Sequence, residues 1–139
     1  MIETILLGMR TIRREMRSVR PMDLSVPQFR VLAFLKHHEG ASLSEVAEHI
    51  GLVLPSMSKA VDWLVKHGLV TREISPRDRR RVILALTPEG SETFQSARDA
   101  TQARIAEMLA VLSSEEHDTV MRAMRILRTI FAPGREDAK

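Results

Sequence analysis

Residues 42–68 have the sequence SLSEVAEHIGLVLPSMSKAVDWLVKHG, which predicts two helices joined by a tight turn. Ser42 and Glu45 form an S-x-x-E capping box at the start of the first helix, and Gly51 ends that helix. Pro55 suits the first turn of the second helix, because its missing N–H removes no intrahelical hydrogen bond there. This order of a short helix, a glycine-containing turn and a second helix is typical of the helix-turn-helix.

The second of these helices is predicted to have one apolar and one free face. At about 100° per residue, Met57, Val61 and Leu64 lie together, with Val65 beside them. Hydroxyl and lysine side chains on a free face can serve phosphates or base edges in a DNA groove. An ordinary amphipathic helix with a solvated back gives the same pattern, so both interpretations stay open at this point. The free face carries Pro55, Lys59 and Lys66, and its flanks carry Ser56, Asp62 and Trp63.

A hairpin with a charged tip is predicted directly after this helix. Two β-prone runs, residues 69–74 and 81–86, flank the segment S-P-R-D-R-R. Arginines so close together repel one another, whereas a phosphate backbone or a narrow minor groove attracts each of them. We expect Asp78 to pair with Arg80 or a neighbour and to fix the shape of the tip. The four arginines are Arg77, Arg79, Arg80 and Arg81.

Helical periodicity continues on both sides of this central region. Pro21 is expected to end a first helix, and further helix starts are predicted at Ser25–Gln28, Thr87–Pro88 and Ser113–Glu116. The first helix and the last two carry narrow apolar stripes that nothing obvious within one chain would cover. A second copy of the chain would bury them, so we expect a homodimer. The stripes are Ile2, Ile5, Leu6, Met9, Ile12, Met16 and Val19; Phe94, Ala97, Thr101, Ile105, Met108 and Leu112; and Val120, Met124, Leu127 and Phe131.

The predicted fold class is mainly α with a small β-hairpin wing (α+β). It corresponds to a winged helix-turn-helix with a helical dimerisation region. Residues 25–87 are expected to form the DNA-binding domain, and residues 1–24 and 88–139 the dimerisation region. One groove-entering helix per chain in a dimer favours a pseudo-palindromic operator with half-sites about 10 bp apart.

Composition narrows the class of protein. Residues 51–81 contain seven cationic and three anionic side chains, which gives this segment a net charge of +4. The net charge of the whole chain is +3, so the excess positive charge lies in the helix-turn-helix and hairpin. The absence of cysteine removes disulfides, thiolate zinc sites and a cysteine nucleophile. No apolar run is long enough to span a membrane, and the charge order at the N-terminus is not that of a signal peptide, so we expect a cytoplasmic protein.

An enzyme is the first alternative, and little in the sequence favours it. Glu45 and His49 have a spacing that metals can use, but no third ligand is evident nearby, and such pairs are usually solvated. There is no Gly-rich phosphate loop and no nucleophile elbow. We therefore expect no catalytic residues, no metal and no cofactor. A winged-helix protein–protein adaptor without specific DNA binding is the second alternative, against which the arginine tip speaks.

Two stretches of the sequence resemble the MarR family of transcriptional regulators. They are LSVPQFRVLAFL at residues 24–35 and LSEVAEHIGLVLPSMSKAVDWLVKHGLVTREISPRDRRRVILALTPEG at residues 43–90. The wing signature of the family, an aspartate followed two residues later by an arginine, matches Asp78 and Arg80. Its strand-to-helix exit L-T-x-x-G matches Leu86, Thr87 and Gly90.

The resemblance implies a homodimer that binds double-stranded DNA, usually as a repressor released by a small molecule or an oxidant. It implies groove contacts from Ser56, Ser58 and Lys59, and a minor-groove or backbone contact from Arg80 that Asp78 orients. The sequence departs from the family pattern at Val53 and Leu54, where many relatives have polar residues. It also departs at Trp63, and we expect this side chain to pack on the surface of its own domain.

A small-molecule effector is the least defined part of this interpretation. The resemblance places a pocket between the dimerisation helices and the winged domain, near Met9, Arg13, Met16 and Phe29. The same residues also describe ordinary core with one solvated arginine, which is the interpretation we favour.

Overall fold

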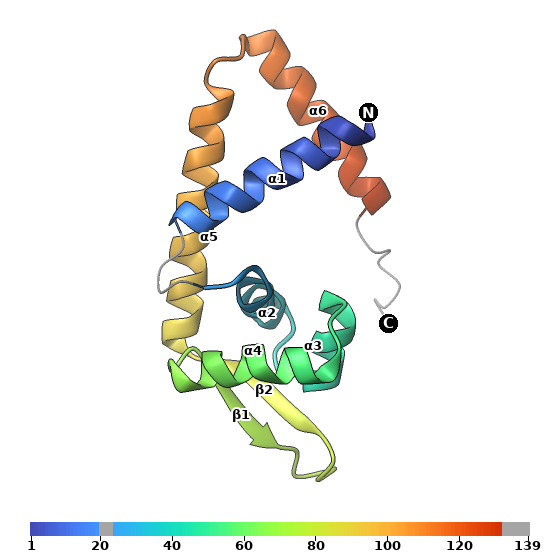
Figure 1. Cartoon of the computed structure of the whole chain (residues 1–139), viewed down its shortest axis with the longest axis vertical. Coiled ribbons are helices and arrows are strands. Elements are labelled where there is room, and N and C mark those ends of the chain that lie inside the picture. Colours follow the sequence, from blue (N-terminus) through green and yellow to red (C-terminus); the bar gives the residue numbers. More distant parts are fainter. Residues whose placement is uncertain (20–23, 132–139) are drawn as a thin grey trace. The chain divides into compact units, whose positions relative to one another are not determined.

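The computed structural model describes residues 1–19 and 24–131 of the chain. It is mostly helical with one two-stranded antiparallel hairpin, which confirms the predicted fold class (Figure 1). Two compact units are present, residues 1–103 and 104–139, and the predicted domain boundaries remain a prediction. Pro21 and the end of the chain at Pro133–Gly134 lie outside the described residues. The elements are α1 (Ile2–Val19), α2 (Val26–His37), α3 (Leu43–Ile50), α4 (Leu54–Lys66), β1 (Val70–Ile74), β2 (Val82–Leu86), α5 (Pro88–Leu109) and α6 (Ser114–Phe131).

The predicted capping boxes form, which is why the helices begin where the sequence indicated. At α3 the Ser42 hydroxyl accepts the Glu45 N–H at 3.2 Å, and the Glu45 carboxylate accepts the Ser42 N–H at 2.7 Å. Each such pair satisfies two backbone donors that the first helical turn leaves without partners. The same reciprocal bonds join Ser25 to Gln28 at α2 and Ser113 to Glu116 at α6.

The core of the first unit lies between α2, α3 and α4, which contact one another, and the hairpin packs against it (Figure 1). Met57, Val61 and Leu64 are fully buried, as their spacing on α4 predicted. Val65, which was predicted to lie beside them, is 37% exposed. Val65 lies about 100° around the helix from Leu64, which places it at the edge of the buried face.

The hairpin pairs Val70 with Leu86 at its base and Ile74 with Val82 near its tip. It is anchored to the helices because the Leu84 N–H donates to the Ala41 carbonyl at 2.9 Å. Each strand begins one residue later than predicted. The Leu69 N–H is used by the end of α4, and the Arg81 N–H by the turn at the tip.

The junction between the hairpin and α5 explains the L-T-x-x-G motif. Thr87 ties the start of α5 to the preceding turn, since its hydroxyl donates to the Gly68 carbonyl at 2.7 Å and accepts the Gly90 N–H at 2.9 Å. A Cβ on Gly90 would collide with the Leu69 carbonyl oxygen. Only glycine therefore lets the start of α5 pass this close to the turn between α4 and β1.

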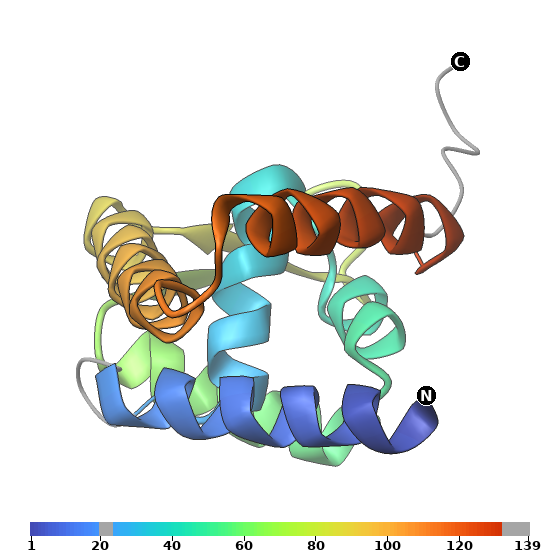
Figure 2. The same ribbon diagram turned by 90° about the horizontal axis from the view of Figure 1, so that it is seen from above.

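Helices α1 and α6 are each a single uninterrupted helix (Figures 1 and 2). Much of the predicted stripe on α1 is exposed, including Ile2, Leu6 and Met9, and α6 has no buried residue. Leu112, predicted to extend the stripe of α5, follows the end of that helix at Leu109, because the turn into Ser113 begins there. Within the described ranges, no helix is long and apolar enough to cross a membrane.

Candidate nucleic-acid interface

The first turns of α4 present Pro55 and three polar side chains, Ser56, Ser58 and Lys59, which together we call the recognition face. Pro55, Ser56 and Lys59 are exposed and Ser58 is half-buried. The apolar face of α4 packs against α2 and α3, which leaves the recognition face on the side away from the core. Val53 is the N-cap and makes no side-chain cap, so the helix starts without the usual hydroxyl or carboxylate.

The wing tip, residues 75–81, is held in shape by its own backbone and two short polar side chains. The Asp78 carboxylate accepts the Arg80 backbone N–H at 3.0 Å, and the Asp78 carbonyl accepts the Arg81 N–H at 2.9 Å. Asp78 thus fixes the tip, as expected, but its partner at Arg80 is the main chain. The Arg80 guanidinium is therefore left for other partners.

Ser75 is a second organiser of the tip, and sequence reasoning missed it. Its side chain is nearly buried, and its hydroxyl accepts the N–H groups of Arg77 at 3.3 Å and Asp78 at 3.4 Å. Its own N–H donates to the Arg81 carbonyl at 2.9 Å. The S-P-x-D pattern offered a signal, because serine and aspartate before a turn bond to the backbone a few residues ahead.

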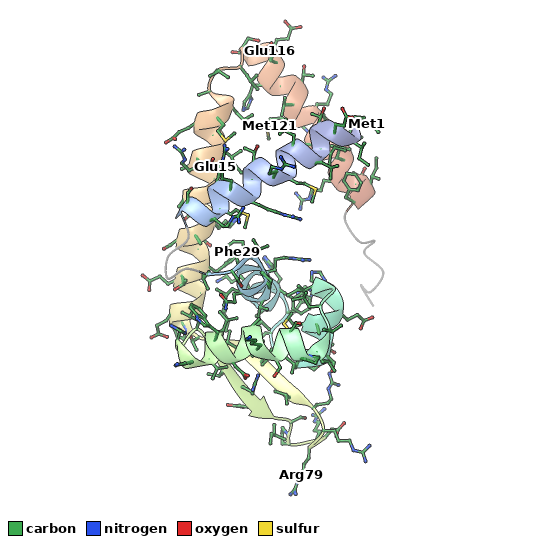
Figure 3. All side chains as sticks on the ribbon, in the orientation of Figure 1. Met1, Glu15, Phe29, Arg79, Glu116 and Met121 are labelled. Atoms are coloured by element: carbon green, nitrogen blue, oxygen red, sulfur yellow. The ribbon has the colours of Figure 1, made fainter. Side chains whose placement is uncertain are left out.

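The arginines of the hairpin fall into two groups. Arg72 and Arg81 are paired inside the domain, with Asp62 at 2.7 Å and Glu45 at 3.0 Å respectively. Arg77, Arg79 and Arg80 are exposed, and in the part of the chain that the structure describes no ion pair joins their guanidinium groups. Arg79 lies at the outer end of the hairpin (Figure 3). The unpaired positive charge is thus concentrated at the tip.

Glu45 connects the start of α3 to the wing. One carboxylate oxygen accepts the Ser42 N–H and the other accepts a hydrogen bond from Arg81. These contacts, the Ser42 backbone N–H first and Arg81 after it, lower the pKa of Glu45 below its ordinary value of 4.5. His49, whose spacing from Glu45 metals can use, packs against the Phe34 ring, with centroids 4.5 Å apart. No cluster of three metal-ligating side chains occurs among the described residues.

A hollow of about 620 Å³ separates the starts of α3 and α4 from the wing. Four of the predicted DNA-binding residues line it, namely Pro55, Ser58, Arg80 and Arg81. The other five predicted residues, Ser56, Lys59, Arg77, Asp78 and Arg79, lie outside its lining. The recognition face and the wing tip therefore border one concave, cationic surface.

Trp63 packs on its own domain, as expected. The indole is half-buried against the core and stacks on His67, with ring centroids 3.7 Å apart. The Nδ1–H of His67 in turn donates to the Trp63 carbonyl at 2.8 Å, so the pair closes the end of α4.

Two of the four residues considered for an effector share a hollow. Met9 and Arg13 line a shallow hollow of about 370 Å³ on α1, together with Leu6, Arg10 and Arg17. Phe29 packs against Phe94 with ring centroids 5.3 Å apart and belongs to the edge of the core. Met16 is half-buried on α1.

The chain is similar in sequence and in fold to transcriptional regulators. A model of the MarR family matches residues 24–82. One relative is YfiV of Bacillus subtilis (strain 168), which is named an uncharacterized HTH-type transcriptional regulator and is 33% identical over 106 residues. These residues cover 76% of this chain and 66% of that relative, which is just under two thirds of its length. Among solved structures, the YusO protein from Bacillus subtilis is 28% identical, with a TM-score of 0.76 and 92% of each chain covered. The transcriptional repressor CouR, bound to a 23-mer DNA duplex, is 29% identical, with a TM-score of 0.74 over 91% of this chain and 89% of that one.

Proposed function

We propose that the chain is a member of the MarR family and a sequence-specific DNA-binding transcriptional regulator that acts as a ligand-responsive repressor. The observation that carries this proposal is the concave surface lined by Pro55 and Ser58 of the recognition face and by Arg80 and Arg81 of the wing tip, of which Arg81 is paired with Glu45 and Arg80 is left for other partners. The DNA-bound structure of the related repressor CouR supports it. In this role the protein works in the cytoplasm, has no cofactor and catalyses no reaction.

The proposed binding mode divides the contacts between two elements. Helix α4 enters the major groove, where Ser56, Ser58 and Lys59 meet base edges and phosphates and Pro55 fixes the helix start. The wing tip meets the flanking backbone or minor groove, where each free guanidinium displaces counterions from the phosphates. Asp78 sets the direction of Arg80 through the backbone bond at the tip.

We also propose that the protein binds as a homodimer to a pseudo-palindromic operator. Support comes from the exposed apolar residues of α1 and α6, which a second copy would cover. Two copies would place two recognition helices on half-sites about 10 bp apart, one turn of the duplex.

The ligand response is the remaining part of the proposal. The hollow on α1, with Met9 and three arginines, is the surface we would test first. A small molecule that raises the melting temperature of the wild type and releases bound DNA, but does neither with Arg13→Ala, would support this position. A ligand that acts equally on both proteins would move the site elsewhere.

The experiment that tests the function is binding of a fluorescent duplex taken from upstream of the gene, competed by a shuffled duplex across a salt series. Specific, salt-dependent binding that the shuffled duplex does not displace is the expected result. Selection from a random-sequence duplex pool serves as the second arm when the operator lies elsewhere. Failure to enrich any sequence would contradict the proposal, and would favour the protein–protein adaptor instead.

A further inference from the structure

Two large apolar side chains lie in water at the start of α4. Val53 is 68% exposed and Leu54 is 51% exposed. They occupy the N-cap and the first helical position, where serine, threonine, aspartate or asparagine would cap the helix, and Val53 makes no cap. The start of α4 therefore lacks a side-chain cap and also exposes apolar surface. Local departures of this kind are expected at functional positions.

Leu54 is continuous with the proposed DNA-binding surface. It lines the same hollow as Pro55, Ser58 and Arg80. On the helix it lies four residues, or one turn, before Ser58, so the two side chains share a face. In a helix-turn-helix the first residues of the recognition helix are those that reach the base edges. An apolar group at this point can meet one distinctive apolar feature of the major groove, the 5-methyl group of thymine.

We propose that Leu54, with Val53 beside it, reads thymine methyl groups in the operator half-site, an inference that rests on the proposed DNA-binding function. The occupant of this apolar patch is thus double-stranded DNA, because Arg80 and Arg81 line the same hollow as Leu54 and would repel a basic partner. The hydroxyls of the recognition face and Lys59 supply polar contacts to the DNA. The alkyl side chains of Val53 and Leu54 add a preference for thymine at the neighbouring base pair.

The test removes a methyl group from the DNA and nothing else. Duplexes enriched by the wild-type protein from a random-sequence pool are remade with deoxyuridine in place of one thymine at a time, and affinity is measured by fluorescence anisotropy. We expect at least one thymine per half-site at which the wild type loses roughly fourfold in affinity, the effect of burying one methyl-sized group.

The protein variants then assign that loss to particular side chains. Leu54→Gln keeps a good helix former, and Val53→Ser supplies the missing N-cap, so both variants are expected to fold. Each should bind the thymine and deoxyuridine duplexes with more nearly equal affinity than the wild type does. Val65→Ser is the matched control, because it removes an exposed apolar side chain from the far end of the same helix. It should keep the full deoxyuridine penalty.

Two results would overturn the inference while leaving the proposed function in place. The first is a wild-type protein indifferent to deoxyuridine at every thymine of its enriched site. The second is a penalty that Leu54→Gln and Val53→Ser both retain in full. A wild-type protein that enriches no duplex would overturn the proposed function and this inference together, and the three outcomes are therefore distinguishable.

Discussion

At the wing tip, two residues determine where the arginines can act. Asp78 binds the backbone of Arg80, and Ser75 binds the backbone of Arg77 and Asp78. Each residue closes the turn without using a guanidinium group. The tip is consequently ordered by neutral or acidic side chains, and its positive charge remains directed outward.

Arg80→Ala should weaken binding to many DNA sequences alike, because a phosphate or minor-groove contact carries little base information. We expect the dependence of log K on log salt to lose about one unit of slope. Anisotropy titrations over a salt series measure both effects. Arg98→Ala, which removes the same charge from an exposed position on α5, serves as the control. Unchanged affinity and slope in Arg80→Ala would mean that the wing does not contact DNA.

Lys59→Ala and Ser56→Ala should act differently, because base-edge contacts distinguish sequences. We expect each variant to change the ranking among operator variants, with about 1–3 kcal/mol of discrimination lost at the contacted position. Competition binding against a panel of single-base operator variants is the measurement. A uniform loss across the panel would reassign these side chains to the backbone.

Gly90→Ala tests the close approach of α5 to the backbone of Leu69. The added methyl group would collide with the Leu69 carbonyl, so we expect a loss of about 1–3 kcal/mol in the free energy of unfolding. Urea denaturation followed by circular dichroism gives the value. Gly8→Ala in α1 is the control, since its Cβ would meet nothing within 4 Å, and it should be neutral or slightly stabilising. A stable Gly90→Ala protein would show that α5 can shift away from α4.

At the scale of elements, Glu45 and Arg81 join the start of α3 to the wing. Glu45→Gln should keep the capping box, because glutamine also accepts the Ser42 N–H, while weakening the pair with Arg81. Both side chains are about half exposed, so the effect is small: about twofold to fivefold faster hydrogen exchange in residues 75–86. Glu48→Gln, an exposed neighbour on the same helix, provides the control with the same change of charge.

The stabilisation of the wing by Glu45 and Arg81 should also depend on pH. Because folding lowers the pKa of Glu45 from 4.5, its contribution to stability is present above that pH and is lost as the pH falls through the lower, folded value. The wild-type wing should therefore exchange more slowly than the wing of Glu45→Gln at neutral pH, and this difference should disappear as the pH falls below about 4.5. A wild-type wing whose exchange differs from that of the variant by the same ratio at pH 7 and at pH 3 would contradict the role of this carboxylate.

At the scale of the whole molecule, the exposed apolar residues of α1 and α6 predict self-association. We expect light scattering at micromolar concentration to give twice the chain mass of 15.7 kDa. Replacing Ile5 and Ile126 with glutamate should favour the monomer, since buried charges without partners oppose association. A wild-type monomer under these conditions would contradict the dimer, and the operator would then need no two-fold symmetry.

The helices, the hairpin and the cationic character of residues 51–81 can all be predicted from the sequence. These follow from local rules: capping pairs, glycine stops and apolar periodicity act within a few residues of one another. Met57, Val61 and Leu64 are buried because one helical face fixes their direction.

Which arginines are free of ion pairs depends on contacts between distant parts of the chain. Glu45 and Arg81 are 36 residues apart, and Asp62 meets Arg72 only because the hairpin folds back against α4. The exposure of Val65, the burial of Ser75 and the hollow beside Leu54 likewise depend on which elements pack together. Charge and polarity can be counted along a chain, but whether a side chain is paired, buried or left in water depends on neighbours that the fold brings from elsewhere.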